Sequence, residues 1–110
     1  MKIIICAHIE VDPELRDKAL QEATPVIQAT LDEPGCLHYN WAADAVNPSL
    51  ILVYEEWQSA ADLDLHFTTE NFSNMHQILG ASGLINATAR KFSINQEAPV
   101  MKDGAATAEF

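Results

Sequence analysis

The chain has 110 residues, of which 48% are hydrophobic, and this predicts one globular domain with a single core. Its 16 acidic residues outnumber its 6 basic residues and give a formal net charge of −10, which argues against nucleic acid as a partner because a phosphate backbone would be repelled. No stretch approaches the roughly 18 apolar residues that span a bilayer, and the N-terminus turns acidic where a signal peptide would be cleaved, so we expect a cytoplasmic protein with no membrane partner.

The first predicted element is a strand over residues 2–11, which are β-branched and apolar and are followed by an Asp-Pro boundary. Ile5 and Ile9 belong to one face of this strand, but Ile4 and Cys6 make the other face apolar as well. A strand that is apolar on both faces is expected to be covered on both.

A helix is predicted next, with Asp12 as its N-cap and Pro13 at its first position. Apolar residues then recur at helical spacing until the turn "DEPG" at 32–35 stops the helix. This segment should lie on one face of the sheet.

Two strands follow, over residues 36–45 and 50–57, and the short turn "VNPS" between them predicts a β-hairpin. In the first of the two, alternation places Leu37 with Tyr39 and Trp41 on one face.

Ser59 and Asp62 predict a capping box at the start of a short helix that carries His66. A second helical stretch is expected over about 71–79, and an alternating segment over 85–94 predicts the last strand.

This order of elements is that of an α+β, ferredoxin-like βαββαβ plait with a four-stranded antiparallel sheet. We expect one domain over 1–95, followed by a flexible C-terminal tail over 96–110 that is poor in large apolar residues. Helices would cover only one face of the sheet. The apolar second face of the first strand therefore predicts a homodimer that packs sheet against sheet, a dimeric α/β barrel.

Three stretches of this chain, "EPGCLHYNW", "VYEEWQSAADLDLHF" and "NFSNMHQIL", resemble the antibiotic biosynthesis monooxygenase family, in particular its quinol-monooxygenase-like branch. The resemblance runs from about residue 2 to residue 94. It implies a dimer of ferredoxin-like subunits, each with a cavity between sheet and helices. Some members of the family oxidise quinols, hydroxylated aromatics or polyketide-like phenols with molecular oxygen and without metal or flavin.

The resemblance thus implies a cofactor-independent monooxygenase, an oxidoreductase whose partners are O2 and a small quinol-like or phenolic substrate. A deprotonated phenol is electron-rich enough to reduce oxygen itself, so the protein must supply an apolar pocket, a base and hydrogen-bond donors. We expect no metal site and no cofactor. The alternative from another class is a non-catalytic dimer that binds a small molecule in the same pocket; haem-degrading and metabolite-isomerising members are further alternatives.

His66 and Trp57 are the expected catalytic residues. An imidazole has a reference pKa of about 6.5 and is a suitable base at neutral pH, although His66 could instead bond a loop carbonyl. Trp57 would form a wall of the pocket and donate its indole N–H to a substrate oxygen; the alternative is a core aromatic residue.

The expected substrate-binding residues belong to the two short helices and the third strand: Leu63, Phe67, Phe72, Met75, His76 and Tyr54. His76 is notable because haem-degrading relatives carry an axial histidine in the corresponding stretch. Those relatives add an asparagine and a tryptophan where this chain has Ala7 and His66.

Glu55 shares a strand face with Trp57, and a carboxylate on that face needs a partner. Arg90 on the last strand is the predicted partner, in a structural ion pair. A catalytic carboxylate is the alternative.

Overall fold

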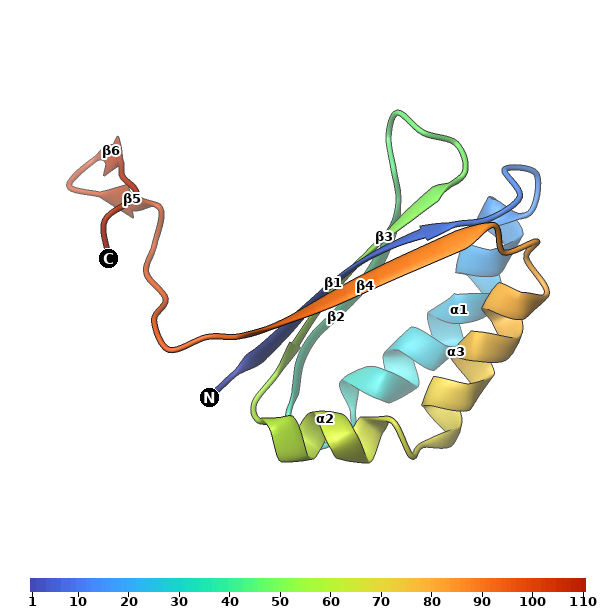
Figure 1. Ribbon diagram of the computed structural model, residues 1–110, viewed down its shortest axis with the longest axis horizontal. Helices are drawn as coiled ribbons and strands as arrows, with labels where there is room; N and C mark the ends of the chain where they lie inside the picture. The colour runs from blue at the N-terminus through green and yellow to red at the C-terminus, as the bar shows by residue number, and fades with distance from the viewer.

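The computed structural model describes all 110 residues and confirms the predicted ferredoxin-like fold. The elements of its body are β1 (Ile3–Glu10), α1 (Arg16–Leu31), β2 (Cys36–Ala43), β3 (Leu50–Trp57), α2 (Ala60–His66), α3 (Glu70–Gly80) and β4 (Asn86–Ser93). The four strands form one antiparallel sheet in the order β2-β3-β1-β4, and all three helices lie on one side of it (Figure 1). No helix has the length and apolar character that crossing a membrane requires.

The C-terminal tail leaves the end of β4 and extends away from the body (Figure 1). It holds two short strands, β5 (Met101–Lys102) and β6 (Ala105–Ala106), which pair as a small antiparallel hairpin. Near its start, Glu97 accepts hydrogen bonds of 3.0 and 3.2 Å from the Lys2 ammonium.

Helix α1 begins at Arg16, and the prediction that Asp12 is its N-cap is wrong. The Asp12 carboxylate accepts a hydrogen bond of 2.9 Å from the Glu14 N–H, and its carbonyl accepts one of 2.9 Å from the Leu15 N–H. Asp12 therefore stabilises a separate turn before the helix. An aspartate side chain that accepts from the backbone N–H two residues later favours a turn over a helix at that point.

A β-bulge at the start of β2 changes which side chains face the helices. The register shifts between Cys36 and His38, so Leu37 is the extra residue and Cys36 lies opposite Trp57. Leu37 is 39% exposed, whereas Cys36 packs against the core, so the prediction that Leu37 shares the buried face of Tyr39 is wrong. Burial raises the pKa of the Cys36 thiol to about 11, which keeps it protonated at neutral pH.

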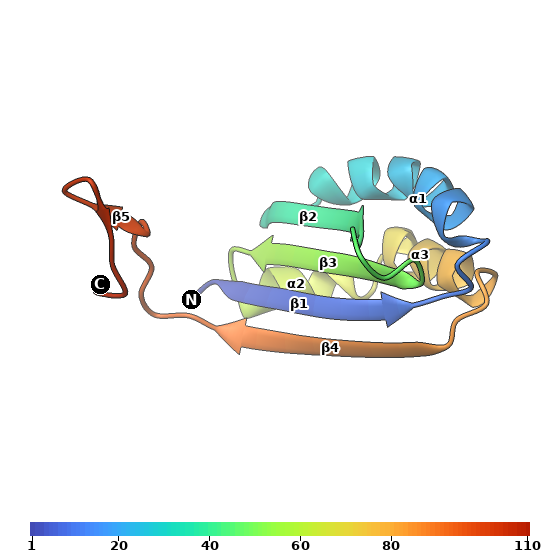
Figure 2. The same cartoon turned by 90° about the horizontal axis from the view of Figure 1, so that it is seen from above.

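The core lies on the helix side of the sheet. Its buried strand residues include Ile5, Ala7 and Ile9 of β1 and Ile51, Val53 and Trp57 of β3. Strand β4 forms the sheet edge next to β1, and all eight of its residues are exposed (Figure 2). The helix side of the sheet is thus open along β4.

The loop before β2 gives a stability prediction with a matched control. Gly35 has φ +73°, and a Cβ there would collide with the side chain of Asp62, whose N–H is capped by the Ser59 hydroxyl at 3.2 Å. We expect Gly35→Ala to lower the free energy of unfolding by more than about 1 kcal/mol, whereas Gly80→Ala should raise it by about 0.4–1 kcal/mol. Gly80 ends α3, and a Cβ there would meet nothing within 4 Å. Urea unfolding followed by circular dichroism measures both changes; equal stability of the two variants would contradict this assignment.

Candidate functional site

A cavity of about 470 Å³ lies between the sheet and helices α2 and α3. This is within the usual size range of small-molecule sites. Two rows of paired strand residues form its floor, Trp41–Val53–Ala7–Ala89 and Tyr39–Glu55–Ile5–Lys91. Ala7 and Ala89 have small side chains, so space remains between this part of the sheet and the helices.

His66 ends α2 and projects into the site with only 2% of its surface exposed. Its Nδ1 lies 2.8 Å from Oε1 of Glu33, which comes from the loop after α1. The carboxylate can only accept, so Nδ1 carries the hydrogen and donates it. The other ring nitrogen, Nε2, makes no hydrogen bond within the protein and is left with its lone pair.

Glu33 is itself held by the loop between α2 and α3. Its Oε2 accepts a hydrogen bond of 2.9 Å from the Asn71 amide and a long one of 3.5 Å from the Thr69 hydroxyl. The Glu33 side chain is 9% exposed, so these donors replace the water that the carboxylate loses. Glu33 therefore connects the end of α1 to His66 at the end of α2 and to the start of α3.

Four aromatic rings surround the His66 imidazole. Ring centroids lie at 4.6 Å for Trp57, 5.5 Å for Phe72, 5.7 Å for Tyr39 and 5.9 Å for Phe67. Aromatic faces attract a cation, and the Glu33 carboxylate does so as well. The imidazole thus lies between an aromatic cluster and a carboxylate.

Glu55 is a second buried carboxylate, on the floor of the cavity and 8% exposed. Its Oε1 accepts a hydrogen bond of 2.9 Å from the Trp57 indole N–H. Burial raises the pKa of Glu55 above its ordinary value, while this hydrogen bond and the nearby His66 act in the opposite direction. Burial and the charge of Glu55 also raise the pKa of Tyr39, so its hydroxyl stays protonated and can donate.

The raised pKa of Glu55 predicts a pH-dependent loss of stability. The unfolded carboxyl ionises near the reference value of 4.5, whereas the folded one ionises at higher pH, so this group favours folding at low pH and loses that contribution as pH rises through the folded pKa. Glutamine at position 55 can still accept the hydrogen bond from Trp57. We expect the melting temperature of Glu55→Gln minus that of the parent protein to increase as pH is raised from about 4.5 to 8. Exposed Glu14, replaced by glutamine, should show no such trend in thermal melts. A difference for Glu55→Gln that does not grow with pH would contradict the raised pKa.

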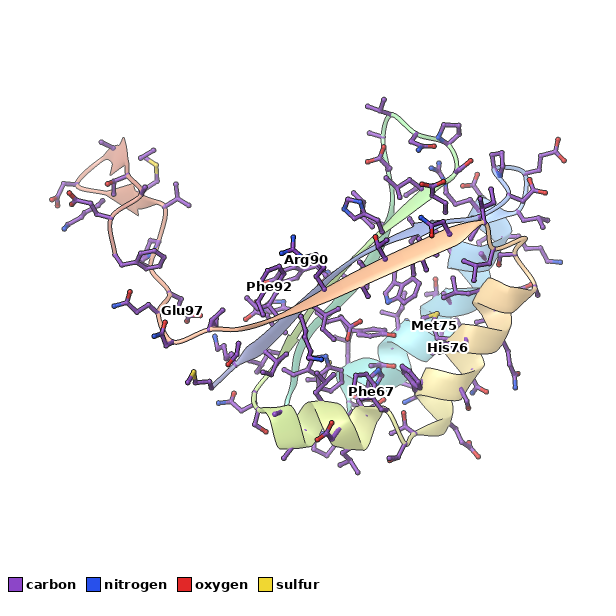
Figure 3. The ribbon with its side chains drawn as sticks, viewed as in Figure 1. Phe67, Met75, His76, Arg90, Phe92 and Glu97 are labelled. Atoms are coloured by element: carbon purple, nitrogen blue, oxygen red, sulfur yellow. The ribbon has the colours of Figure 1, made fainter.

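The structure brings four of the predicted substrate-binding residues together. Phe67, Phe72, Met75 and His76 all line the cavity, and Figure 3 shows Phe67, Met75 and His76 on the helix side of the sheet. Leu63 does not line it and is buried in the core at 4% exposure.

Trp57 is placed differently from the expectation. It is fully buried and is not part of the cavity wall, and its N–H is used by Glu55 rather than left free for a substrate oxygen. It lies behind His66 and Glu55, as a core aromatic residue that supports both.

Two predicted placements are wrong. Tyr54 lies on the opposite face of the sheet, where its hydroxyl donates to Glu56 at 2.8 Å, because alternation along β3 turns it away from Glu55. Arg90 pairs with Cys6 in register and therefore shares that outer face. Its guanidinium lies 5.0 Å over the Phe92 ring, and Figure 3 shows both on the side of the sheet away from the helices.

His76 is tied to its own helix. Its Nδ1 lies 3.0 Å from the Phe72 carbonyl and its ring packs on Phe72 with centroids 4.3 Å apart. Ala7, at the position where haem-degrading relatives have asparagine, offers no polar group to the cavity. No group of three or more His, Cys, Asp or Glu side chains is arranged to hold a metal ion.

Sequence reasoning missed Glu33, Trp41 and Lys91 as parts of this site, and it left the facing of Tyr39 open. The indole Nε1 of Trp41 is buried beside the cavity without an acceptor in full hydrogen-bond geometry, although its N–H is close enough to the Tyr39 hydroxyl to oppose in part the rise in the pKa of Tyr39. Glu33 stood in the motif "EPGC" and Tyr39 in the inward alternation of the second strand. Lys91 had no local signal, because every residue of β4 is exposed.

The chemistry of the site follows from this arrangement. A weak base at His66 Nε2 faces an apolar cavity, and Tyr39 and Trp41 offer donors on the same side of the floor. Such a site can remove a proton from a hydroxyl group and stabilise the resulting anion.

Comparison with known proteins gives a consistent picture. A family model described as antibiotic biosynthesis monooxygenase matches residues 2–78. An uncharacterised protein of Synechocystis, sll1783, is 30% identical over 70 residues, which cover 64% of this chain and 48% of that protein. The chain thus spans about half the length of this relative. YcnE of Bacillus subtilis, which carries a provisional monooxygenase name, is 29% identical over 70 residues, and these cover 64% of this chain and 74% of YcnE.

Solved structures show the same fold. A Deinococcus radiodurans protein with a provisional name in that family superposes with a TM-score of 0.82 at 19% identity, over 91% of this chain and 99% of that one. A structure described as an antibiotic biosynthesis monooxygenase is 26% identical, with a TM-score of 0.75 over 86% of this chain and 99% of that one.

Proposed function

Because the chain belongs to the antibiotic biosynthesis monooxygenase family, we propose that it is a cofactor-independent monooxygenase that oxidises a small hydroxylated aromatic substrate with molecular oxygen. The observation that carries this proposal is the His66 imidazole, whose Nδ1 is held by Glu33 while Nε2 is free beside an apolar cavity. The same arrangement, of a carboxylate that orients an imidazole base, serves proton abstraction in other enzymes.

The reaction begins when Nε2 of His66 takes the proton of a substrate hydroxyl. Glu33 stabilises the imidazolium, and the Tyr39 hydroxyl and Trp41 N–H donate to the phenolate oxygen. The phenolate supplies the electrons that reduce O2: one oxygen atom becomes a ring carbonyl, and the other leaves as water with the proton from His66 and the displaced ring hydrogen. A phenol and O2 thus give a quinone and water, and the apolar cavity keeps bulk water away from the anion.

Oxygen uptake by the purified protein tests this proposal. A panel of naphthols and hydroquinones is incubated aerobically, and uptake is compared with the rate without protein. We expect at least one substrate to be consumed faster than the uncatalysed rate and to give a quinone that contains one oxygen atom more and two hydrogen atoms fewer than the substrate. Binding of panel compounds with no uptake above the control on any of them would favour the non-catalytic binding dimer instead.

We further propose that two copies pack through the outer face of the sheet. This face carries Ile4, Leu52 and Phe92 with no helix over it, and Phe92 is 38% exposed. An apolar patch on a sheet face is uncommon in a monomer. Light scattering should give twice the 12.1 kDa of one chain.

Leu52→Asp should shift this mass to that of the monomer, because a carboxylate at the centre of the interface would be desolvated. Leu65→Asp, at a 49% exposed site on α2, is the control and should leave the mass unchanged. A monomeric parent protein at micromolar concentration would contradict the homodimer.

A further inference from the structure

We infer that the substrate is a hydroxylated aromatic acid, bound with its hydroxyl at His66 and its carboxylate, or another anionic group, at Lys91. This inference rests on the proposed function for the position of the hydroxyl. It adds the second recognition point, a cation at the open edge of the cavity.

The strand register places Lys91 in the cavity. Ile5 of β1 pairs with Glu55 on one side and with Lys91 on the other, and paired residues point to the same face of a sheet. Tyr39 lies opposite Glu55, so one row across all four strands reads Tyr39–Glu55–Ile5–Lys91, and all four residues line the cavity. The acidic end of this row is covered by helices, and the cationic end is open.

The Lys91 ammonium has no acidic partner. The ion pairs of the protein involve Lys2, Arg16, Lys18, His38 and His66, although 16 acidic residues are available for 6 basic ones. Arg90 also lines the cavity, but the strand register turns its side chain to the opposite face, over Phe92, so Lys91 is the cation whose side chain lies on the helix side. An anion approaching a chain of net charge −10 is repelled, and a free ammonium at the open edge offsets this locally.

The spacing sets the length of the substrate. Neighbouring strands are about 4.8 Å apart, so the backbones at Glu55 and Lys91 are separated by roughly 10 Å, with Ile5 between them. His66 lies at the Glu55 end of this row, because its ring centroid is 5.7 Å from that of Tyr39, the residue paired with Glu55. A fused two-ring body lies across Ile5 and Ala7, with a hydroxyl at one end and an anionic group at the other. A single small ring would reach only one of the two polar ends.

Two naphthalene probes separate the charge from the aromatic body. Calorimetric titration at neutral pH compares 6-hydroxy-2-naphthoate, which is anionic, with 2-naphthol, which is neutral. We expect the parent protein to bind the anion more tightly. Lys91→Met should weaken binding of the anion about tenfold, the scale of one charge-assisted contact, and leave 2-naphthol within about twofold. Lys102→Met, in the C-terminal hairpin, is the matched control and should change neither affinity.

Three results would overturn the inference: no binding of either probe by the parent protein, equal affinity for both, or a Lys91→Met variant that loses affinity for both probes alike or for neither. If Lys91→Met changes the affinity for neither probe, the role of Lys91 is that of a charged residue on an edge strand, which prevents pairing with another chain. Titration needs no turnover, so a charge preference that depends on Lys91 would stand even if oxygen uptake fails. Conversely, oxygen uptake restricted to neutral quinols would support the proposed function and contradict the inference.

Discussion

Replacing His66 with glutamine is expected to lower the initial rate of oxygen uptake by at least about 100-fold, the usual contribution of a positioned base. Glutamine can still donate to Glu33 through its amide, so the loop between α2 and α3 keeps its contact, whereas the lone pair of Nε2 is lost. Circular dichroism and thermal melting of the variant show whether the fold is kept.

His76→Gln is the comparison for that variant. This second cavity histidine is exposed and tied to its own helix through Phe72, so its replacement should cost less than about tenfold in rate, well below the loss of a base. If His66→Gln keeps a rate within threefold of the parent protein, His66 is not the base.

Trp57→Ala is expected to have the largest effect on stability, a loss of about 3–5 kcal/mol in the free energy of unfolding. The side chain is fully buried in the core, stacks beside His66 and gives Glu55 its hydrogen bond. Denaturant unfolding measures this cost. A loss below about 1 kcal/mol would contradict the assignment of Trp57 to the core.

The role of the indole N–H can be separated from that of its volume. Trp57→Phe keeps an aromatic ring but leaves the Glu55 carboxylate without its donor. We expect this substitution to cost more in the parent protein than in the Glu55→Gln background, because an ionised carboxylate loses more than an amide does. Equal costs in the two backgrounds would show that the charge of Glu55 adds nothing to this hydrogen bond.

The order of the elements was predictable because each has a local signature. The apolar first strand, the Ser59 N-cap and the turn between the second and third strands are read within a few residues, and the structure contains all three. The predicted capping box is only half formed, because the Asp62 carboxylate accepts from the Ser59 hydroxyl rather than from the Ser59 N–H. The facing of Glu55 followed from alternation with Trp57, and the same rule, applied to Tyr54, would have placed it on the outer face.

The remainder of the site depends on contacts between distant residues. Glu33 reaches His66 across 33 positions, and no local pattern indicates that pairing. The bulge that turns Leu37 outward depends on how β2 meets β3. In β4 the residues of both faces are exposed, so no alternation of buried and exposed residues distinguishes the face of Lys91 from that of Arg90, and Arg90 was predicted on the wrong one.

The central claim is that this protein adds one atom of molecular oxygen to an aromatic substrate without a cofactor. Mass spectrometry of the product formed under isotopically labelled oxygen gas tests it most directly, with purified protein and the most active substrate of the panel. We predict one labelled atom in the quinone product and the other in water, at a yield that falls with the His66→Gln variant. A product without label, or a labelled yield equal with and without the protein, would contradict the claim.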